Sequence, residues 1–347
     1  MVKVEIRGAT PSDEEPLLEL ARHLNTVNLP NDRGHIQRLL AHSEKSFRGE
    51  VPERRRKFVF LLCDAHNGTA MGTSMIVAQL GRRDAPYIYL DVIEEEKYSS
   101  ALDRHFKHTV LRIGFSYDGP TEIGGLIVAP QYRRGAEQLG LLISYVRFLY
   151  ISTHRELFRN EILAELLPPL EPDGTSHLWE AFGRRFTGMS YAEADLLSSE
   201  NKSFVRDLFP NGSVYATLLS PEAQGVIGKV GAQTRGVEKM LRRVGFRYAK
   251  RIDPFDGGPH FIAPADEITL LRDTVRPRVG AGEPGAGKVR ALVGRDVNGP
   301  PYFRAVASDV SLAGTTISIP DDVRAHLGVS DGDEVFCLPL KQNSSTS

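Results

Sequence analysis

Two arginines and a glycine stand between an apolar stretch and a helical pattern, an arrangement suited to holding an anion. Residues 124–128 form a short apolar run rich in β-branched side chains, which predicts a buried strand. Arg133, Arg134 and Gly135 follow in a turn, and from Gln138 onward apolar residues recur at helical spacing. The first N–H groups of a helix are unpaired and lie at its positive end. The segment predicts a phosphate site, although a strand–turn–helix unit without a ligand would have the same pattern.

The composition sets the limits within which such a site must work. A chain of 347 residues, 41% of them hydrophobic, predicts two domains or one large domain with an appendage. The formal net charge of −1 argues against general binding of nucleic acid. No apolar run approaches the length of a membrane span, and the first residues have no signal-peptide pattern. We therefore expect a cytoplasmic protein with neither a membrane nor a nucleic-acid partner.

The elements that position the anion site follow from periodicity. Strands are predicted over residues 2–6, 58–63, 70–77, 86–92 and 160–167, and helices over residues 36–47, 176–186 and 236–245. The last two helices end near a glycine and lead into aromatic residues, which suggests a duplicated or two-lobed core. Residues 93–118 are polar and have no clear period. Cys63 and Cys337 lie in apolar runs, and no metal-ligand spacing is present.

The pattern V-x-P-x-Y-R at residues 128–133, followed by a glycine and a leucine-rich helix, resembles the CoA-binding motif of the GNAT N-acyltransferase superfamily. Gly140 fits the final glycine of that motif, whereas Gln138 stands where its first glycine is expected. The resemblance implies an α+β, GNAT-like acyl-CoA N-acyltransferase fold with a duplicated or two-lobed core and a small β-rich C-terminal module.

The predicted organisation divides the chain in order. An acyl-CoA-binding lobe occupies residues 1–195 and a second GNAT-like or substrate lobe occupies residues 196–275. A glycine-rich linker covers residues 276–287, a β-rich module residues 288–340 and a disordered tail residues 341–347. The acidic turns of the β-rich module offer no basic face for DNA, so we interpret it as a structural or oligomerisation module.

Further motifs resemble a narrower family, the arginine (and ornithine) N-succinyltransferases. They include S-F-R-G-E at residues 46–50, W-E-A-F-G-R-R-F at 179–186, E-A-Q at 222–224 and F-D-G-G-P at 255–259. The resemblance implies transfer of a succinyl group from succinyl-CoA to the α-amino group of arginine or ornithine, in arginine catabolism. Succinyl-CoA, or another acyl-CoA, would be a cosubstrate. No permanently bound cofactor and no metal are expected.

The resemblance also assigns the acyl-CoA contacts. Leu126 matches the contact of the family with succinyl-CoA, and Val128 lies beside it on the same strand. The remaining cofactor-binding residues would hold the pyrophosphate: Arg133, Arg134, Gly135 and Gly140.

Three acidic residues are candidates for the amine side of the reaction. Glu122, at the start of the strand, is a candidate catalytic base or amine-binding group; the alternative is a charge at a strand edge. Asp253 and Asp256 are candidate substrate-binding residues for a guanidinium group. The alternative for these two aspartates is turn chemistry in D-P-F-D-G-G.

The sequence departs from the family at its proton donor. The family has a histidine in a V-H-P-Q-T segment, and Gly231 occupies that place in V-G-A-Q-T. His260 is a candidate catalytic residue that would substitute for it. The family also has an arginine after Y-x-Y, where this chain has Leu90. If the geometry of the family persists, Gly231→His is expected to raise the rate.

These departures leave two hypotheses open. The first is an active N-acyltransferase that acts on arginine, ornithine or a related amine. The second is a catalytically impaired paralogue that serves as a ligand-binding or regulatory subunit. In either case we expect small-molecule ligands and a homo-oligomer or pairing with a paralogue.

Overall fold

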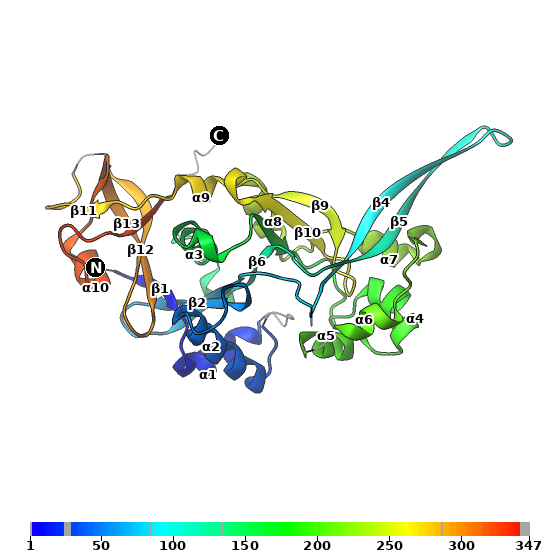
Figure 1. The fold of residues 1–347 in the computed structure, drawn as a ribbon, viewed down its shortest axis with the longest axis horizontal. Coiled ribbons are helices and arrows are strands. Elements are labelled where there is room, and N and C mark those ends of the chain that lie inside the picture. The colour runs from blue at the N-terminus through cyan, green and yellow to red at the C-terminus, as the bar shows by residue number, and fades with distance from the viewer. Residues whose placement is uncertain are drawn as a thin grey trace. The chain divides into compact units, whose positions relative to one another are not determined.

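The computed structural model describes residues 2–23, 29–83, 85–133, 135, 137–200, 202–285 and 287–340. The chain forms two compact units, each containing helices and strands (Figure 1). The first unit comprises Met1–Ala78, Ile123–Arg159 and Ala265–Ser347, and the second comprises Gln79–Glu122 and Asn160–Pro264. The linear boundaries given above stay predictions, and the predicted tail lies outside the described residues.

The first unit is built on a mostly antiparallel sheet. Its helices are α1 (Glu14–Ala21), α2 (Arg33–Phe47), α3 (Leu139–Thr153), α9 (Thr269–Asp273) and α10 (Asp321–Leu327). Its strands are β1 (Val4–Gly8), β2 (Lys57–Asp64), β3 (Ala70–Val77), β6 (Thr121–Val128, from Ile123 onward), β11 (Arg278–Val279), β12 (Val289–Asp296), β13 (Phe303–Ala313), β14 (Thr316–Ser318) and β15 (Phe336–Pro339). The strand order is β11-β14-β13-β1-β2-β3-β6, with β12 paired to β13 and β15 to β12.

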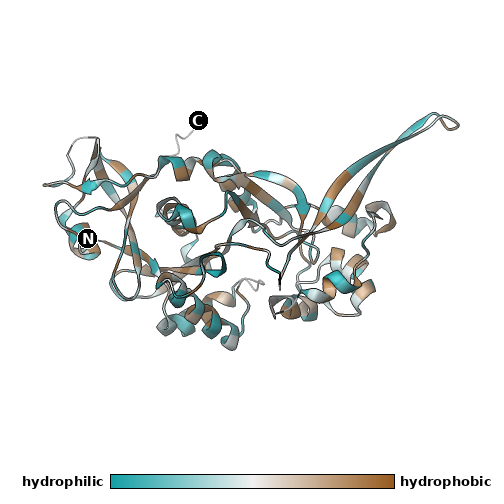
Figure 2. Ribbon diagram, viewed as in Figure 1, coloured by the Kyte–Doolittle hydropathy of each residue, from teal (hydrophilic) through white to brown (hydrophobic). Residues whose placement is uncertain are grey.

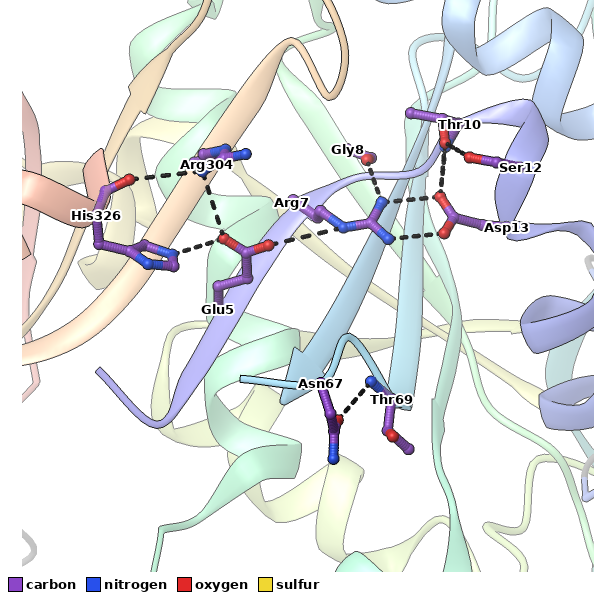
Figure 3. A network of polar contacts seen from close by, with 10 residues as sticks. All are labelled: Glu5, Arg7, Gly8, Thr10, Ser12, Asp13, Asn67, Thr69, Arg304 and His326. Atoms are coloured by element: carbon purple, nitrogen blue, oxygen red, sulfur yellow. Dashed lines mark hydrogen bonds and ion pairs between the residues drawn. The ribbon is translucent and has the colours of Figure 1, made fainter. Parts of the chain in front are cut away.

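The C-terminal strands extend the N-terminal sheet. β13 pairs antiparallel with β1, with Ile6 opposite Ala305. A network of polar contacts supports this junction (Figure 3). Arg7 Nη2 donates to Asp13 Oδ1 at 2.7 Å, and Arg7 Nε lies 3.7 Å from Glu5 Oε1. Glu5 Oε2 in turn lies 2.6 Å from His326 Nε2 of α10. The two ends of the described chain are therefore joined by both backbone pairing and charge.

The second unit carries the remaining strands of the sheet. Its helices are α4 (Arg184–Thr187), α5 (Tyr191–Glu200), α6 (Ser203–Leu208), α7 (Pro221–Val226) and α8 (Arg235–Arg243). Its strands are β4 (Tyr87–Ser99), β5 (Arg104–Ser116), β7 (Glu161–Glu165), β8 (Val214–Tyr215), β9 (Arg247–Ile252) and β10 (Pro259–Pro264), together with Thr121 and Glu122 of β6. Their order is β6-β7-β10-β9-β4-β5-β8. β6 and β7 are parallel at Thr121 with Ile162 and Glu122 with Leu163, and the neighbouring pairs are antiparallel.

The polar stretch that the sequence left unassigned is a long hairpin. β4 and β5 pair from Tyr87 with Ser116 to Ser99 with Arg104. Figure 1 shows this hairpin as a two-stranded ribbon, and Figure 2 shows hydrophobic and hydrophilic residues mixed along it. Near its tip Tyr98 and Phe106 are exposed. Because neither face of the tip is buried, its residues have no reason to alternate in polarity. Among the described residues, no helix combines the length and apolar character needed to cross a bilayer.

The close approach of β3 to β6 yields a prediction. A Cβ atom at Gly72 would lie 2.7 Å from Ile127 O and 3.3 Å from Val128 Cγ2. Gly72→Ala is therefore expected to lower the free energy of unfolding by about 1–3 kcal/mol, because the backbone must separate. Thermal and urea unfolding measure the effect. Gly34→Ala in α2 is the control: its Cβ meets Arg38 Nη1 at 3.4 Å, an ordinary contact, and the change should stabilise by about 0.5–1 kcal/mol. Equal stability of the two variants would contradict the prediction.

Candidate active site

The predicted strand, turn and helix are present in the first unit as β6, a short turn and α3. Gly125 lies in the left-handed region of the backbone, with φ of 56°. Gly124, Gly125 and Leu126 are half-buried, whereas the residues before and after them in β6 are buried. The middle of this strand is therefore accessible to solvent, which the contact proposed for Leu126 requires.

The turn after β6 is held by one of its own cations. Arg133 Nε donates to Val128 O at 2.7 Å, which leaves the two terminal nitrogens for other acceptors. Gly135 lies in open space, since a Cβ there would meet no atom within 4 Å. Arg134, which the sequence also assigns to the pyrophosphate, lies outside the described residues.

The residue before α3 has the backbone conformation typical of the glycine that the motif expects. Gln138 is left-handed, with φ of 51° and ψ of 43°, and its side chain makes no capping hydrogen bond. This conformation favours glycine, so Gln138 carries strain that glycine would not. Gly140 follows in the first turn, where a Cβ would meet only Val128 Cγ2 at 3.9 Å. The first N–H groups of α3 are thus not covered by the side chain at the helix start.

A pocket of about 490 Å³ opens beside the start of α3. Its lining includes Lys3, His66, Gln131, Tyr132 and Gly135. The volume is in the range of pockets that hold small-molecule ligands. The pocket therefore places free space next to a residue of the predicted pyrophosphate turn. Asp64 and Glu137 also line it, and Lys3 Nζ lies 3.5 Å from Glu137 Oε1, so its lining carries both signs of charge.

The second unit gathers acidic groups around one histidine. Glu165 ends β7, and the register of the sheet pairs it with His260 of β10. His260 Nε2 lies 3.5 Å from Glu165 Oε1, and His260 Nδ1 lies 2.6 Å from Tyr87 Oη. Asp253 follows β9, and its carboxylate lies in the same group: the ligand atoms of Glu165, Asp253 and His260 are all within 4.8 Å of one another.

Burial controls the ionisation of this cluster. Desolvation, followed by the charges of Glu122 and Asp253, raises the pKa of Glu165 well above its usual value. Burial also raises the pKa of Asp253, although Lys202 opposes the rise. For Asp195 of α5, burial and then the charge of Asp253 raise the pKa to about 6. The cluster therefore lacks enough positive charge of its own, and a bound cation would stabilise the ionised carboxylates.

His260 is neutral in this setting. It is fully buried, and desolvation, followed by the charges of Arg251 and Lys202, lowers its pKa to about 3. Within the described residues, His260 Nε2 has no hydrogen-bond partner. A buried polar atom without a partner is costly, so this nitrogen is suited to contact a ligand. Its low pKa makes it a weak base but leaves it able to accept a hydrogen bond.

Asp253 and Asp256 also take part in the turn between β9 and β10. Asp253 Oδ1 accepts from Phe255 N at 2.7 Å and from Asp256 N at 3.3 Å. Asp256 Oδ1 accepts from Gly258 N at 2.7 Å. Each aspartate thus orders the turn with one oxygen, and among the described residues its other oxygen accepts no hydrogen bond. The turn chemistry and the substrate role are therefore compatible.

The structure adds residues that the sequence did not single out. Glu165 and Tyr87 lie against His260, and the signal for them is the strand order β7-β10-β9-β4, which a single sequence does not reveal. Glu122 is buried and lies opposite Leu163 in the parallel pair. The resemblance predicts an arginine at position 90, which is Leu90 here; nearby, Arg251 of the adjacent β9 places its guanidinium 4.1 Å from the centre of the Tyr89 ring. Glu165, Asp253 and His260 are also the described residues that could hold a divalent cation.

A histidine does not fit at position 231 on this backbone. Gly231 N donates to Leu167 O at 2.8 Å. A Cβ at Gly231 would lie 2.6 Å from Pro168 O and 3.0 Å from Leu167 O. The backbone around Gly231 therefore leaves no room for the histidine that the resemblance predicts at this position.

Both units together define the fold of a GNAT-like acyltransferase, as the sequence predicted. A solved structure described as arginine/ornithine succinyltransferase subunit AI from Pseudomonas aeruginosa matches with a TM-score of 0.83 and 25% identity, covering 99% of this chain and 100% of that one.

The chain belongs to the arginine N-succinyltransferase beta subunit family. The model of that family matches residues 4–270, and the model of its C-terminal domain matches residues 285–339. Arginine N-succinyltransferase subunit beta of Pseudomonas aeruginosa is 31% identical over 96% of this chain and 98% of its own length. Arginine N-succinyltransferase of Escherichia coli strain 55989 is 29% identical over 99% of both chains. The family resemblance found in the sequence is confirmed.

The crowding at position 231 yields a prediction. Gly231→His is expected to lower the free energy of unfolding by about 1–3 kcal/mol and to give no gain in acyl transfer, because its Cβ meets two carbonyl oxygens. Thermal unfolding and an assay of thiol release measure both effects. Gly231→Ala, which adds the same Cβ, should show a similar loss. Gly236→Ala, where a Cβ meets nothing within 4 Å, is the control. A faster variant with unchanged stability would show that the histidine can be restored.

The raised pKa of Asp195 yields a prediction about pH. Its carboxyl group binds a proton more tightly in the folded protein, at a pKa of about 6, than in the unfolded chain, at about 4. This group therefore lowers the free energy of unfolding as pH rises from about 4 to 6. Asp195→Asn should remove that loss and stabilise the protein by roughly 1–2 kcal/mol at pH 8, with little effect at pH 4. Urea unfolding at the two pH values is the measurement. An equal effect at both would rule out the ionisation of Asp195 as the cause.

Proposed function

We propose that the protein transfers a succinyl group from succinyl-CoA to the α-amino group of arginine or ornithine. Membership of the family carries this proposal, and the acidic cluster around His260 supports it. Both amino acids are cations with hydrogen-bond donors at their ends, and the cluster offers carboxylates and an unpaired nitrogen acceptor. Acyl-CoA is the cosubstrate, held by the turn and helix start that follow β6.

The cationic side chain of the substrate is bound by Glu165, Asp253 and Asp256. Desolvation is the first cause of a raised pKa in each of these carboxyl groups, although the Glu165 side chain keeps 32% of its surface exposed. A guanidinium or ammonium group in the cluster lowers those pKa values, so binding and ionisation support each other. The neutral His260 accepts an N–H from the substrate through Nε2, and Tyr87 fixes the ring through Nδ1.

The reaction needs one proton removed before attack. The α-ammonium group loses a proton to a carboxylate, for which Glu122 is our candidate, and the free amine attacks the thioester carbonyl carbon. The carbonyl oxygen becomes an oxyanion that a backbone N–H at Leu126 stabilises. The positively charged nitrogen of the intermediate releases its extra proton to solvent, and cleavage of the carbon–sulfur bond then gives the neutral amide. CoA leaves as a thiolate that takes up a proton from solvent.

The absent family histidine does not exclude this chemistry. A simple thiol has a pKa of about 8.5, so its anion leaves at neutral pH without full protonation. A missing general acid costs roughly 10²- to 10⁴-fold in rate, and positioning and backbone polarisation remain. The relatives are named as enzymes or enzyme subunits, so the regulatory alternative gains no support from them. Because two of them are named as subunits, assembly as a homo-oligomer or with a paralogue is part of the proposal.

Thiol release tests the proposal. The pure protein is incubated with succinyl-CoA and arginine or ornithine in the presence of a chelator, and the product is identified by mass. We expect an N-succinylated amino acid. Glu165→Gln should raise the KM for arginine roughly 10- to 100-fold, because a carboxylate partner of the cation is lost.

Glu161→Gln is the matched control, since Glu161 begins the same strand as Glu165 and is likewise exposed, but lies outside the group formed by Glu165, Asp253 and His260. It should leave the KM for arginine unchanged. If succinyl-CoA and acetyl-CoA release no thiol with any basic amino acid, although both bind, the protein is a binding subunit and the proposal fails.

A further inference from the structure

Arg147 is a buried cation in the middle of α3. Arg147 is 2% exposed, and it donates its hydrogen bonds to uncharged acceptors. Nε donates to Ser144 O at 3.1 Å, Nη2 to Ser144 Oγ at 2.7 Å and Nη1 to Gly124 O at 3.4 Å. Within the described residues it forms no ion pair.

Such an arrangement is incomplete without an anion. Burying a guanidinium costs free energy that neutral acceptors only partly offset. Desolvation lowers the pKa of Arg147 to about 9, so the group remains a cation at neutral pH. A guanidinium has five N–H donors, and three of them are used by the bonds above. The remaining donors match the two oxygens of a carboxylate.

The location of Arg147 indicates which carboxylate is suitable. Nη1 contacts Gly124, the first residue of the half-buried stretch in the middle of β6. Gly124 and Gly125 have no side chains, and the left-handed Gly125 interrupts the regular course of the strand. A Cβ at Gly125 would meet Met75 Cγ at 3.0 Å, so the flexible Met75 side chain borders this stretch. The cation thus lies directly behind the part of β6 that solvent can reach.

The position along β6 matches the length of a succinyl group. With the pyrophosphate at the turn after Val128 and the thioester at Leu126, the acyl chain extends toward Gly124. Two strand residues span roughly 6.6 Å. The succinyl chain beyond the thioester carbonyl spans roughly 4–5 Å, from standard bond lengths. Its free carboxylate therefore ends near the carbonyl of Gly124, where Arg147 donates.

We propose that Arg147 binds the free carboxylate of the acyl group and thereby selects dicarboxylic acyl-CoA thioesters over simple fatty ones. This inference rests on the proposed function and names a specificity residue that the resemblance does not assign. When the acyl group binds, Arg147 gives up its long hydrogen bond to Gly124 O and forms a bidentate hydrogen bond with the carboxylate.

The test compares succinyl-CoA with butyryl-CoA, which has the same number of acyl carbons and no carboxylate. Binding is measured by calorimetry, and transfer to arginine by thiol release. The wild-type protein should bind succinyl-CoA more tightly. Arg147→Met should weaken succinyl-CoA binding roughly 10- to 100-fold and leave butyryl-CoA binding unchanged, because one charge-assisted contact is lost. Arg147→Lys, which keeps the charge, should retain part of the preference.

Arg56→Met is the control, since Arg56 is half-buried in the same unit and donates to Val51 O at 2.8 Å. It should leave the preference between the two thioesters unchanged. Equal binding of the two thioesters by the wild type, or equal weakening of both in Arg147→Met, would overturn the inference and leave Arg147 as a structural brace. Retained butyryl-CoA binding shows that the variant folds. Absence of transfer with a preserved binding preference would contradict the proposed function and not this inference.

Discussion

Each unit holds ionisable side chains in surroundings that disfavour their charged form, and this constraint organises the candidate site. In the second unit, Glu165, Asp253 and Asp256 share a space in which burial holds all three pKa values high. In the first unit, Arg147 is buried among neutral acceptors. Uncompensated buried charge lowers stability, and folds keep it where a ligand supplies the missing partner. An amino acid with a cationic side chain and an acyl group with a carboxylate are ligands of the two required signs.

The backbone that presents these groups depends on glycine and on strand register. Gly124 and Gly125 leave the middle of β6 without side chains, which brings the strand within reach of the guanidinium on α3. In the second unit the strand register brings the groups together, since pairing of β7 with β10 places Glu165 opposite His260. Neither arrangement relies on a long loop, so the groups are held by hydrogen-bonded elements. Pre-organised groups of this kind lose little free energy when a ligand binds.

Periodicity within single elements predicted much of the fold. It could not predict which strands pair when they lie far apart in the sequence. The strand before Arg133 and the helix after Gln138 were predictable, because their apolar residues recur with the period of each element. The β4–β5 hairpin was not, since its tip is exposed on both faces and has no alternation. Glu165 was missed because its significance comes from pairing with His260, far away in the chain. The roles proposed for Glu122 and Leu126 came from family resemblance, and they stay predictions.

The substitution at position 231 shows how an altered site can remain consistent with the chemistry of its family. Gly231 packs its backbone against Leu167 and Pro168, so the space of a histidine side chain is closed. The two proton transfers of acyl transfer differ in difficulty. A thiolate is a stable leaving group at neutral pH, whereas an ammonium group cannot attack until a base removes its proton. In the proposed reaction the missing acid therefore affects the easier transfer, and Glu122 is our candidate base for the harder one.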